Sequence, residues 1–388
     1  MKDTYISEAV KYIGADDTTL DLFESQYQIP NGVSYNSYVI LDEKVAVMDT
    51  IDERKTDEWF ANLENVLNGR TVDYLVISHL EPDHAANIKR AADKFSKAQL
   101  VLSAKAKAML PQFFDIAHLD ERCLVVKEGD TLELGIHKLH FVMAPMVHWP
   151  EVMVEYEETE KILFSADGFG KFGALSAEEE WTDEARRYFI NIVGKYGVQV
   201  QTLLKKAAAL DIQTICPLHG PVLKENLGFY IGKYLTWSSY EPEEDGVLVA
   251  CASIHGNTKA AAEKMVEVLR ANGASKVVFM DLTRDDMAET VADAFRYGKI
   301  ILAAASYDAG VFPPMEDFLH RLVHKNLQKR TFGLIENGSW APCAAKGMKG
   351  ILEGMKEVNI CENVVSIKST MKDTDVAKME ELAKEILA

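Results

Sequence analysis

Cysteine is scarce and scattered in this sequence. The five cysteines form no C-x-x-C pair, which excludes a zinc ribbon, a rubredoxin-type iron site or a thioredoxin motif within this chain. Reduced, buried thiols are the simplest expectation. Long apolar runs are also missing, because none reaches the roughly 18 residues that a membrane-spanning helix needs, and the N-terminus MKDTYISEAV has no apolar signal core. We therefore expect a cytoplasmic protein that does not enter a membrane.

Basic residues are outnumbered. The chain has 42 Lys and Arg against 60 Asp and Glu, for a net charge of −18. Nucleic acids and anionic membrane surfaces both require basic patches, so we expect neither as a partner. Hydrophobic residues at 48% and charged residues at 26% are typical of a globular protein, and 388 residues favour two domains, each with its own core.

The sequence pattern changes at an acidic, proline-containing segment, residues 238–246. Strand-type runs precede it at residues 37–41, 44–50, 72–78, 123–126, 138–144, 152–157, 161–166 and 212–217, with a long helical stretch at 178–209. After it, strand-like and helical runs alternate regularly, which predicts a doubly wound parallel sheet. We predict an α/β protein with a strand-rich layered domain over residues 1–245 and a domain of flavodoxin-like size over residues 246–388.

The stretch ISHLEPDHAANI, residues 77–88, places four potential metal ligands within six positions, just past a predicted buried strand. Three later candidates follow apolar runs and precede proline or glycine, in HWPE, SADGFG and LHGP. Because all of them lie at predicted strand ends or turns, they can project into one cleft. The candidate ligands are His79, Glu81, Asp83, His84, His148, Asp167 and His219.

Four imidazoles and three carboxylates are too many for one ion and suit two ions that share a carboxylate. An all-nitrogen cluster would favour zinc, whereas Glu81 makes the site richer in oxygen and favours iron or manganese. The alternative is a solvated loop with incidental histidines, which leaves the matching positions at the later strand ends unexplained.

The stretch ACASIHGNTK, residues 250–259, runs from a predicted strand into a predicted helix. Polar side chains beside a glycine and the amides of a helix N-terminus favour an anion. No G-K-[ST] occurs, so the lysine and the magnesium ligand of a nucleoside-triphosphate loop are missing. A monophosphate such as that of FMN fits better, and a plain helix cap is the alternative. The candidate phosphate-binding residues are Ser253, His255, Gly256, Asn257 and Thr258.

Two further loops, in AASYDAGVFP and ENGSWAP, follow later strands at the edge where a flavin ring would lie. Each contains one aromatic residue, Tyr307 or Trp340, that could stack on the ring or be a partly exposed structural side chain. The candidate ring-contacting residues are Ser306, Tyr307, Asp308, Ala309, Gly310, Asn337, Gly338, Ser339 and Trp340.

The pattern H-x-[EH]-x-D-H with distant His, Asp and His resembles the metallo-β-lactamase superfamily. The glutamate variant, together with HWPE and LFSADGFG, resembles the flavodiiron proteins, also called A-type flavoproteins. The resemblance covers nearly the whole chain in the family's domain order. It implies a metallo-β-lactamase-like αββα sandwich followed by a flavodoxin-like domain.

The same resemblance implies a role for each candidate ligand. One iron would be held by His79, Glu81 and His148, and the other by Asp83, His84 and His219, with Asp167 as the bridge. The second flavin loop departs from the family pattern S-P-T-x-N, since Ala305, Ser306 and Asp308 stand there. A carboxylate at Asp308 would alter the hydrogen bonding and the potential of the flavin.

The activity that the resemblance implies is FMN- and di-iron-dependent reduction of oxygen to water, of nitric oxide to nitrous oxide, or of both. Because the chain has no C-x-x-C module, it needs an external electron donor. Rubredoxin is the donor expected by family analogy, and reduced coenzyme F420 serves some relatives. The family also implies a head-to-tail homodimer that pairs the flavin of one subunit with the irons of the other.

Two other functional classes stay open from the sequence. A dinuclear zinc hydrolase of the metallo-β-lactamase superfamily would use the same ligand positions, although Glu81 and the flavin domain disfavour it. An electron carrier without enzymatic activity would keep the flavin and use the first domain as a structural or sensing module. The identity of the bound metal and the consumption of either gas distinguish these alternatives.

Overall fold

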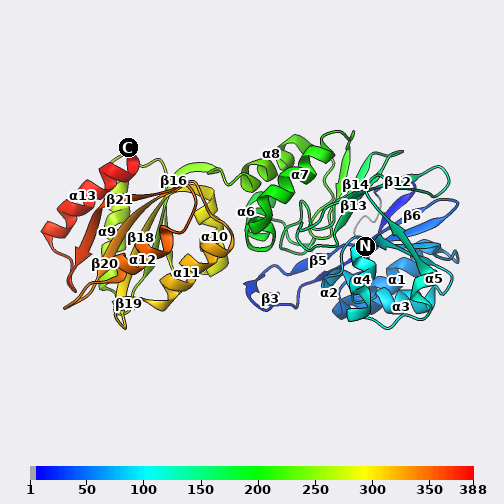
Figure 1. Cartoon of the computed structure of the whole chain (residues 1–388), viewed down its shortest axis with the longest axis horizontal. Coiled ribbons are helices and arrows are strands. Elements are labelled where there is room, and N and C mark those ends of the chain that lie inside the picture. The colour runs from blue at the N-terminus through cyan, green and yellow to red at the C-terminus, as the bar shows by residue number, and fades with distance from the viewer. Residues whose placement is uncertain (1–5) are drawn as a thin grey trace. The chain divides into compact units, whose positions relative to one another are not determined.

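The computed structural model describes residues 6–388 (Figure 1). The chain divides into two compact units. The first comprises Met1–Phe189 and Val198–Leu235, and the second Ile190–Gly197 and Thr236–Ala388. The domain boundary expected after residue 245 stays a prediction, and it falls inside strand β16 (Glu244–Ala252).

The first sheet of unit 1 has the order β1-β6-β7-β8-β9-β10. Its strands are β1 (Val10–Tyr12), β6 (Tyr38–Leu41), β7 (Val45–Met48), β8 (Tyr74–Ile77), β9 (Gln99–Ser103) and β10 (Cys123–Val126). Strands β6 and β7, at the predicted runs 37–41 and 44–50, pair as an antiparallel hairpin. From β7 to β10 the pairing is parallel, so the ends of these strands meet at the same edge.

The second sheet has the order β11-β12-β13-β14-β15. Its strands are β11 (Thr131–Glu133), β12 (Lys138–Met143), β13 (Met153–Glu157), β14 (Ile162–Phe164) and β15 (Thr214–Cys216). Pairing is antiparallel up to β14 and parallel between β14 and β15. Strands β12, β14 and β15 therefore run in one direction, and the segments that follow them leave the sheet at one edge.

Two small two-stranded ribbons, β2 with β5 and β3 with β4, come from the N-terminal part of the chain. Their strands are β2 (Ala15–Asp17), β3 (Leu22–Phe23), β4 (Tyr27–Gln28) and β5 (Val33–Tyr35). These strands of two or three residues are too short to show a period of two in the sequence, which explains why the sequence did not predict them.

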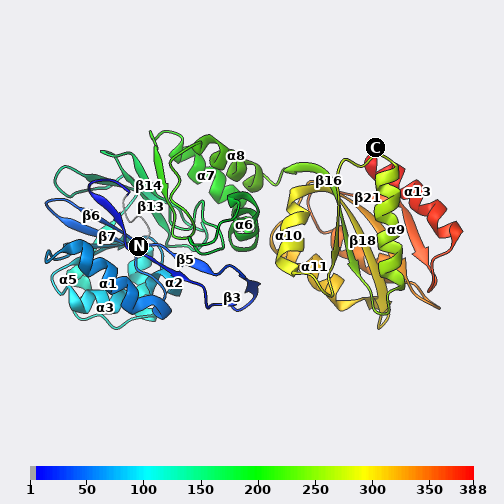
Figure 2. The ribbon, with the colours of Figure 1, turned by 180° about the vertical axis from the view of Figure 1, so that it is seen from behind.

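Helices cover both outer faces of the paired sheets (Figures 1 and 2). They are α1 (Thr56–Leu67), α2 (Pro82–Ala85), α3 (Ile88–Lys94), α4 (Ala104–Met109), α5 (Leu119–Arg122), α6 (Trp181–Tyr188), α7 (Gly197–Ala207) and α8 (Leu227–Ser238). Successive side chains along each strand point to opposite faces of the sheet. Met48 and Val76 point into the core shared with Phe141 of the second sheet, whereas Val47 and Leu75 face α1 and α3. The predicted αββα sandwich is confirmed.

The helical stretch expected over residues 178–209 is interrupted. A π-helix (Phe189–Val193) and a 3-10 helix (Gly194–Tyr196) separate α6 from α7. At Gly197 a Cβ atom would lie 2.3 Å from the carbonyl oxygen of Ser238. Glycine therefore permits a close backbone approach here, and helical periodicity alone does not reveal this break.

Unit 2 is a parallel sheet with the order β17-β16-β18-β20-β21. Besides β16, its strands are β17 (Val277–Asp281), β18 (Tyr297–Tyr307), β19 (Gly310–Val311), β20 (Arg330–Asn337) and β21 (Val358–Ile367), with β19 pairing antiparallel to β18. Counted along the chain without the short β19, this order is the 2-1-3-4-5 of flavodoxin-like sheets. The predicted doubly wound domain is confirmed.

Helices cover both faces of this sheet (Figures 1 and 2). They are α9 (Asn257–Ala271), α10 (Met287–Arg296), α11 (Pro313–His324), α12 (Ala344–Leu352) and α13 (Asp373–Leu387). Helices α9 and α13 share a core with Val249, Ile301 and Ile335 of the sheet, and α10, α11 and α12 lie on the other face. The central strands are apolar on both faces for this reason.

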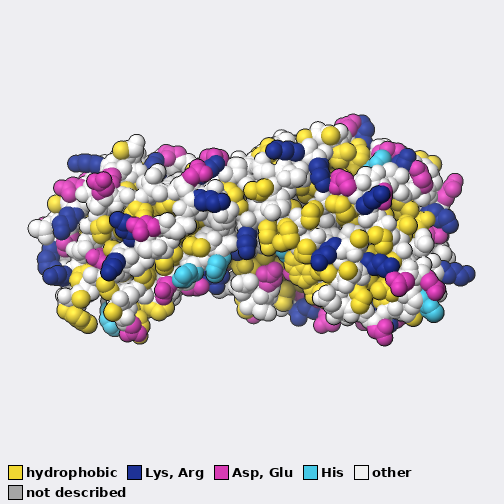
Figure 3. Space-filling model, viewed as in Figure 1, with side chains coloured by type: hydrophobic (Ala, Val, Ile, Leu, Met, Phe, Trp, Pro, Cys, Tyr) yellow, Lys and Arg dark blue, Asp and Glu magenta, His cyan; other side chains and the backbone are white. Residues whose placement is uncertain are grey.

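No helix among residues 6–388 is long and apolar enough to cross a membrane. Figure 3 shows acidic and basic side chains interspersed over the visible face of each unit. The negative net charge is therefore not gathered into one patch on this face.

Candidate metal centre and cofactor cavity

The predicted metal ligands come together in unit 1, each supplied by a segment that follows a strand. His79 and the turn into α2 follow β8, His148 follows β12, Asp167 follows β14, and His219 follows β15. Their ligand atoms form two groups, each with all atoms within 4.8 Å of one another. The first group is His79, Glu81, His148 and Asp167, and the second is Asp83, His84 and His219.

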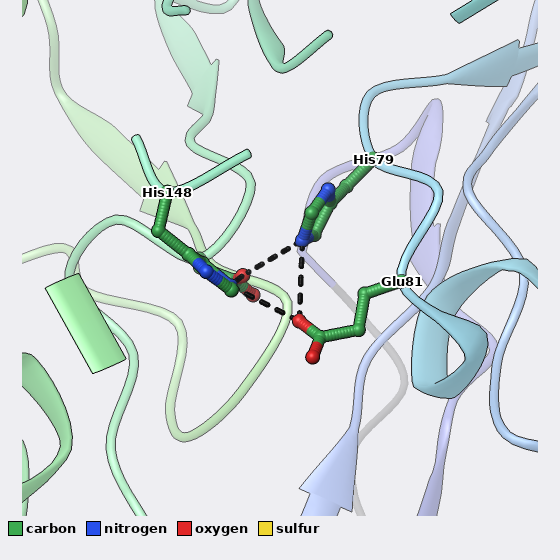
Figure 4. Close-up of side chains that lie close together, drawn as sticks. His79, Glu81 and His148 are labelled. Atoms are coloured by element: carbon green, nitrogen blue, oxygen red, sulfur yellow. Dashed lines mark hydrogen bonds and ion pairs between the residues drawn. The ribbon is translucent and has the colours of Figure 1, made fainter. Parts of the chain in front are cut away.

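In the first group, two imidazoles converge on the Glu81 carboxylate (Figure 4). Glu81 Oε2 lies 3.3 Å from Nε2 of His79 and 3.0 Å from Nε2 of His148. Asp167 Oδ2 completes the group, at 3.4 Å from His79 Nε2 and 3.1 Å from His148 Nε2. Four potential metal-ligand atoms therefore lie close enough together to bind one ion.

The second group is built around the Asp83 carboxylate. Asp83 Oδ2 lies 3.4 Å from Nε2 of His84 and 3.2 Å from Nε2 of His219. The other oxygen of Asp167, Oδ1, lies 3.1 Å from His84 Nε2 and 3.8 Å from His219 Nε2. Asp167 therefore directs one carboxylate oxygen to each group, which is the arrangement that a bridging ligand requires.

Many of the polar atoms in these two groups have no hydrogen-bond partner, as expected for atoms that bind metal ions. Among the described residues, the atoms without a hydrogen-bond partner include both oxygens of Asp83 and of Asp167, and Nε2 of His84, His148 and His219. Buried polar atoms are normally paired, so such a concentration of unpaired donor atoms fits a pair of cations. The mixture of imidazole and carboxylate suits iron, manganese or zinc.

Hydrogen bonds at the far ring nitrogens orient two of the imidazoles. Nδ1 of His79 lies 2.8 Å from the Glu151 carboxylate, and Nδ1 of His219 lies 2.7 Å from the carbonyl oxygen of Ser34. Both oxygens can only accept, so each Nδ1 carries a proton and each Nε2 faces the centre. This arrangement is usual behind metal-binding histidines.

The backbone that carries the ligands is fixed by buried polar groups. The Ser78 amide donates to Asp49 Oδ1 at 2.8 Å, and the Ser78 hydroxyl donates to Glu155 Oε2 at 3.0 Å. The Thr50 hydroxyl donates to the His84 carbonyl oxygen at 2.6 Å. Burial raises the pKa of Asp49 to about 6 and raises that of Glu155 well above its usual range.

Without cations, and despite burial, nearby carboxylates raise the pKa of His79, His84 and His148 and favour protonation of these imidazoles. Burial by itself lowers the pKa of His148, but contacts with Asp167 and Glu81 outweigh it and raise the pKa to about 9. Burial opposes ionisation of Asp167, yet His84 and His148 hold its pKa well below the usual range. Metal ions would displace these protons, as expected for a site of this kind.

Several residues around the centre were not predicted from the sequence. Glu151 stands in the quoted HWPE motif, where an acid three residues from a candidate ligand is a usable signal. The rings of Phe23, Tyr35 and Tyr188 pack around the His219 ring, with centroids 5.5, 6.1 and 5.4 Å away. No local sequence signal marks these, because they come from distant segments.

A cavity of about 690 Å³ lies in unit 2 beyond the ends of β16, β18 and β20. This volume is within the range of small-molecule sites, and its position is the switch point where flavodoxin-like sheets bind their ligands. Of the predicted cofactor-binding residues, all except Gly256 and Gly310 line the cavity. The lining residues that were not predicted are Ile254, Ala305, Ala341, Cys343 and Ser369.

The first loop of the cavity leads into the N-terminus of α9. Gly256 has a φ of +93°, which only glycine adopts without strain, and its amide donates to Ser253 Oγ at 3.1 Å. Asn257 opens the helix and is exposed, while Thr258 is buried. Free amides at the start of a long helix fit a phosphate group.

The two later loops differ in how their side chains are engaged. Asp308 and Ala309, with φ of 47° and 59°, form the two-residue turn between β18 and β19. The Asn337 side chain is committed to the Ser369 backbone, with two hydrogen bonds of 2.9 Å, so it positions a loop. Trp340 is 90% exposed and Tyr307 46%, which leaves both rings available for stacking.

Comparison with known proteins agrees with this architecture. Residues 33–220 match the model of the ODP family beta lactamase. The chain is 26% identical to the nitric oxide reductase of Moorella thermoacetica, over 99% of this chain and 98% of the relative. It is also 26% identical to the rubredoxin-oxygen oxidoreductase of Megalodesulfovibrio gigas, over 100% of this chain and 98% of the relative.

A solved structure extends the likeness to both units. The rubredoxin oxygen:oxidoreductase of the anaerobe Desulfovibrio gigas matches with a TM-score of 0.91 and 25% identity, covering 99% of this chain and 97% of that one. A flavo di-iron protein from Thermotoga maritima, at 23% identity and a TM-score of 0.87, shares the fold. The resemblance to flavodiiron proteins seen in the motifs is thereby confirmed over both units, and the chain is an oxidoreductase.

Proposed function

We propose that this chain is an FMN- and di-iron-dependent reductase of oxygen, of nitric oxide, or of both, supplied with electrons by an external donor. One observation carries the proposal. The same chain holds a cofactor cavity at the switch point of a flavodoxin-like sheet and two groups of potential metal-ligand atoms, most of them buried and unpaired, between which Asp167 lies. The names of the relatives from Moorella and Megalodesulfovibrio support these two gases as substrates.

In unit 1, His79, Glu81 and His148 would hold one iron, and Asp83, His84 and His219 would hold the other. Asp167 would bridge them through the oxygens that face the two groups. When bound, the reduced iron pair and reduced FMN together supply four electrons, the number that converts oxygen to two waters. The hydrogen bonds to Glu151 and Ser34 keep two Nε2 lone pairs directed at the centre.

In unit 2, the loop from Ser253 to Thr258 would hold the FMN phosphate at the N-terminus of α9. Tyr307 and Trp340 would contact the ring, since both are exposed at the cavity and flat aromatic rings stack favourably. Asp308 would lie near the ring and disfavour negative charge on it.

The donor and the assembly complete the proposal. Rubredoxin is the donor named for the Megalodesulfovibrio relative, and reduced coenzyme F420 is the other candidate. A head-to-tail homodimer in the cytoplasm would bring the flavin of one subunit to the irons of its partner.

The proposal is tested by anaerobic stopped-flow of the fully reduced protein mixed separately with oxygen and with nitric oxide. Iron, zinc and FMN are quantified on the same sample. We expect two irons and one FMN per chain, and fast reoxidation of both centres by at least one gas. Bound zinc in place of iron would instead indicate a hydrolase, and reoxidation of flavin without stoichiometric gas consumption an electron carrier.

A further inference from the structure

A small apolar cavity lies between α7 and the second sheet of unit 1. Its volume is about 30 Å³, and a volume of about 10–15 Å³ on this measure is enough for one water-sized molecule. Val154 and Leu163 of the sheet and Val200 and Leu204 of α7 form its sides. The sandwich fold therefore leaves room for a diatomic molecule here.

The walls offer little to a water molecule. The polar side chains among the lining residues are Ser165 and Tyr234. The Ser165 hydroxyl donates to the Gly168 carbonyl oxygen at 2.6 Å, and the Tyr234 hydroxyl accepts from the Phe169 amide at 2.5 Å. Because water needs two to four polar partners and apolar cavities stay dry, this cavity favours an apolar guest.

The cavity reaches the segments that carry two of the metal ligands. Val147, next to His148, and Gly168, next to Asp167, both belong to its lining. At the other extreme, the lining residues Leu203, Ala207 and Leu210 are only half-buried. The cavity thus extends from the partly exposed side of α7 to the backbone beside the metal centre.

We propose that this cavity is a holding site for an apolar diatomic gas on its way to the metal centre. Oxygen and nitric oxide share the relevant chemistry, since both are small, weakly polar and poorly hydrated, and both gain by leaving water for an apolar site. The delivery of these gases to the metals rests on the proposed function. The binding of an apolar atom in the cavity is independent of the proposed function.

Xenon tests the cavity itself, without any reference to activity. Crystals of the full-length protein are pressurised with xenon, and we expect a xenon atom between α7 and strands β12–β14, since dry apolar cavities bind xenon. Absence of xenon from this position would overturn the proposal. The experiment needs neither metal loading nor a functioning electron donor.

Two alanines at the end of α7 provide a matched pair of variants. Ala207 is half-buried and lines the cavity, whereas the neighbouring Ala208 is exposed and does not. Ala207→Leu adds side-chain volume toward the cavity, and Ala208→Leu adds the same volume toward solvent. We expect only Ala207→Leu to lose bound xenon.

The same pair tests delivery to the metals. We expect Ala207→Leu to lower the second-order rate constant for reoxidation of the reduced protein by about tenfold, the effect of a modest added barrier, with iron and FMN contents unchanged. A fall with both gases assigns the cavity to both, and a fall with one assigns it to that gas. Xenon lost without any change in rate would overturn delivery, whereas a wild type that consumes neither gas would defeat the proposed function alone.

Discussion

The candidate metal centre of unit 1 and the candidate cofactor cavity of unit 2 are built in opposite ways. The first is a set of buried side chains, in which His79 and His219 are fully covered and donor atoms converge. The second is a set of loops at the end of a sheet, in which Trp340 is almost fully exposed. A centre made of side chains depends on the identity of each residue, whereas a cavity made of loops depends on backbone position and tolerates substitution.

Asp167→Ala should have the largest effect, because it removes an oxygen from both metal groups at once. We expect loss of bound iron and a fall in the rate of gas reduction of more than about a hundredfold. Loss of a residue that only hydrogen-bonds to a metal ligand already lowers metal affinity or activity about 10–100-fold. Flavin absorbance should remain. Asp211→Ala, which removes an exposed partner of Lys161, is the control. Normal turnover in Asp167→Ala would show that the centre is wrongly assigned.

Glu151→Gln removes the charge behind His79 but keeps the shape of the side chain. We expect iron affinity to fall about 10–100-fold, measured by competition with a chelator. The matched control is Glu158→Gln, which alters a contact of 2.6 Å with His140 at the surface and should leave iron binding unchanged. Equal effects of the two variants would contradict an orienting role for Glu151.

Trp340→Ala probes the exposed loops of unit 2. We expect the Kd for FMN to rise about tenfold, because an aromatic stack contributes about 0.5–1.5 kcal/mol beyond its buried area, while iron content is unchanged. Trp340→Phe retains a flat ring and should restore most of the affinity. An unaltered Kd would mean that the ring of Trp340 makes no contact with the flavin.

Glu155→Gln should have the smallest effect, on the pH dependence of stability. Burial raises the pKa of Glu155 above its usual 4.5, so its contribution to the free energy of unfolding is full below that value and is lost as pH rises through the higher, folded-state pKa. Glutamine cannot ionise. The stability of the variant relative to wild type, from urea unfolding of the metal-free protein, should therefore increase with pH, and a pH-independent difference would contradict this.

The sequence predicted most of what depends on residue type beside a strand end. The two groups of candidate metal ligands and the loop before α9 each follow an apolar run, and parallel strands bring such positions to one edge. The αββα sandwich and the flavodoxin-like order also agree with the structure.

The features that the sequence did not predict depend on contacts between segments far apart in the chain. The ring of Phe23 reaches His219 from a strand of two residues, and Ser34 orients His219 across 185 positions. Asn337 lines the cavity as expected, yet its side chain serves the Ser369 loop. Neither periodicity nor composition carries such information, because both describe only neighbours in the sequence.

The shared carboxylate of Asp167 has a thermodynamic consequence. With one oxygen directed to each group, occupancy of one group fixes the ligand that the other needs. Such coupling is reciprocal: if an ion in the first group changes the affinity of the second group by some factor, an ion in the second group changes the affinity of the first by the same factor. The two groups would therefore load as coupled sites, and filling one would change the affinity of the other.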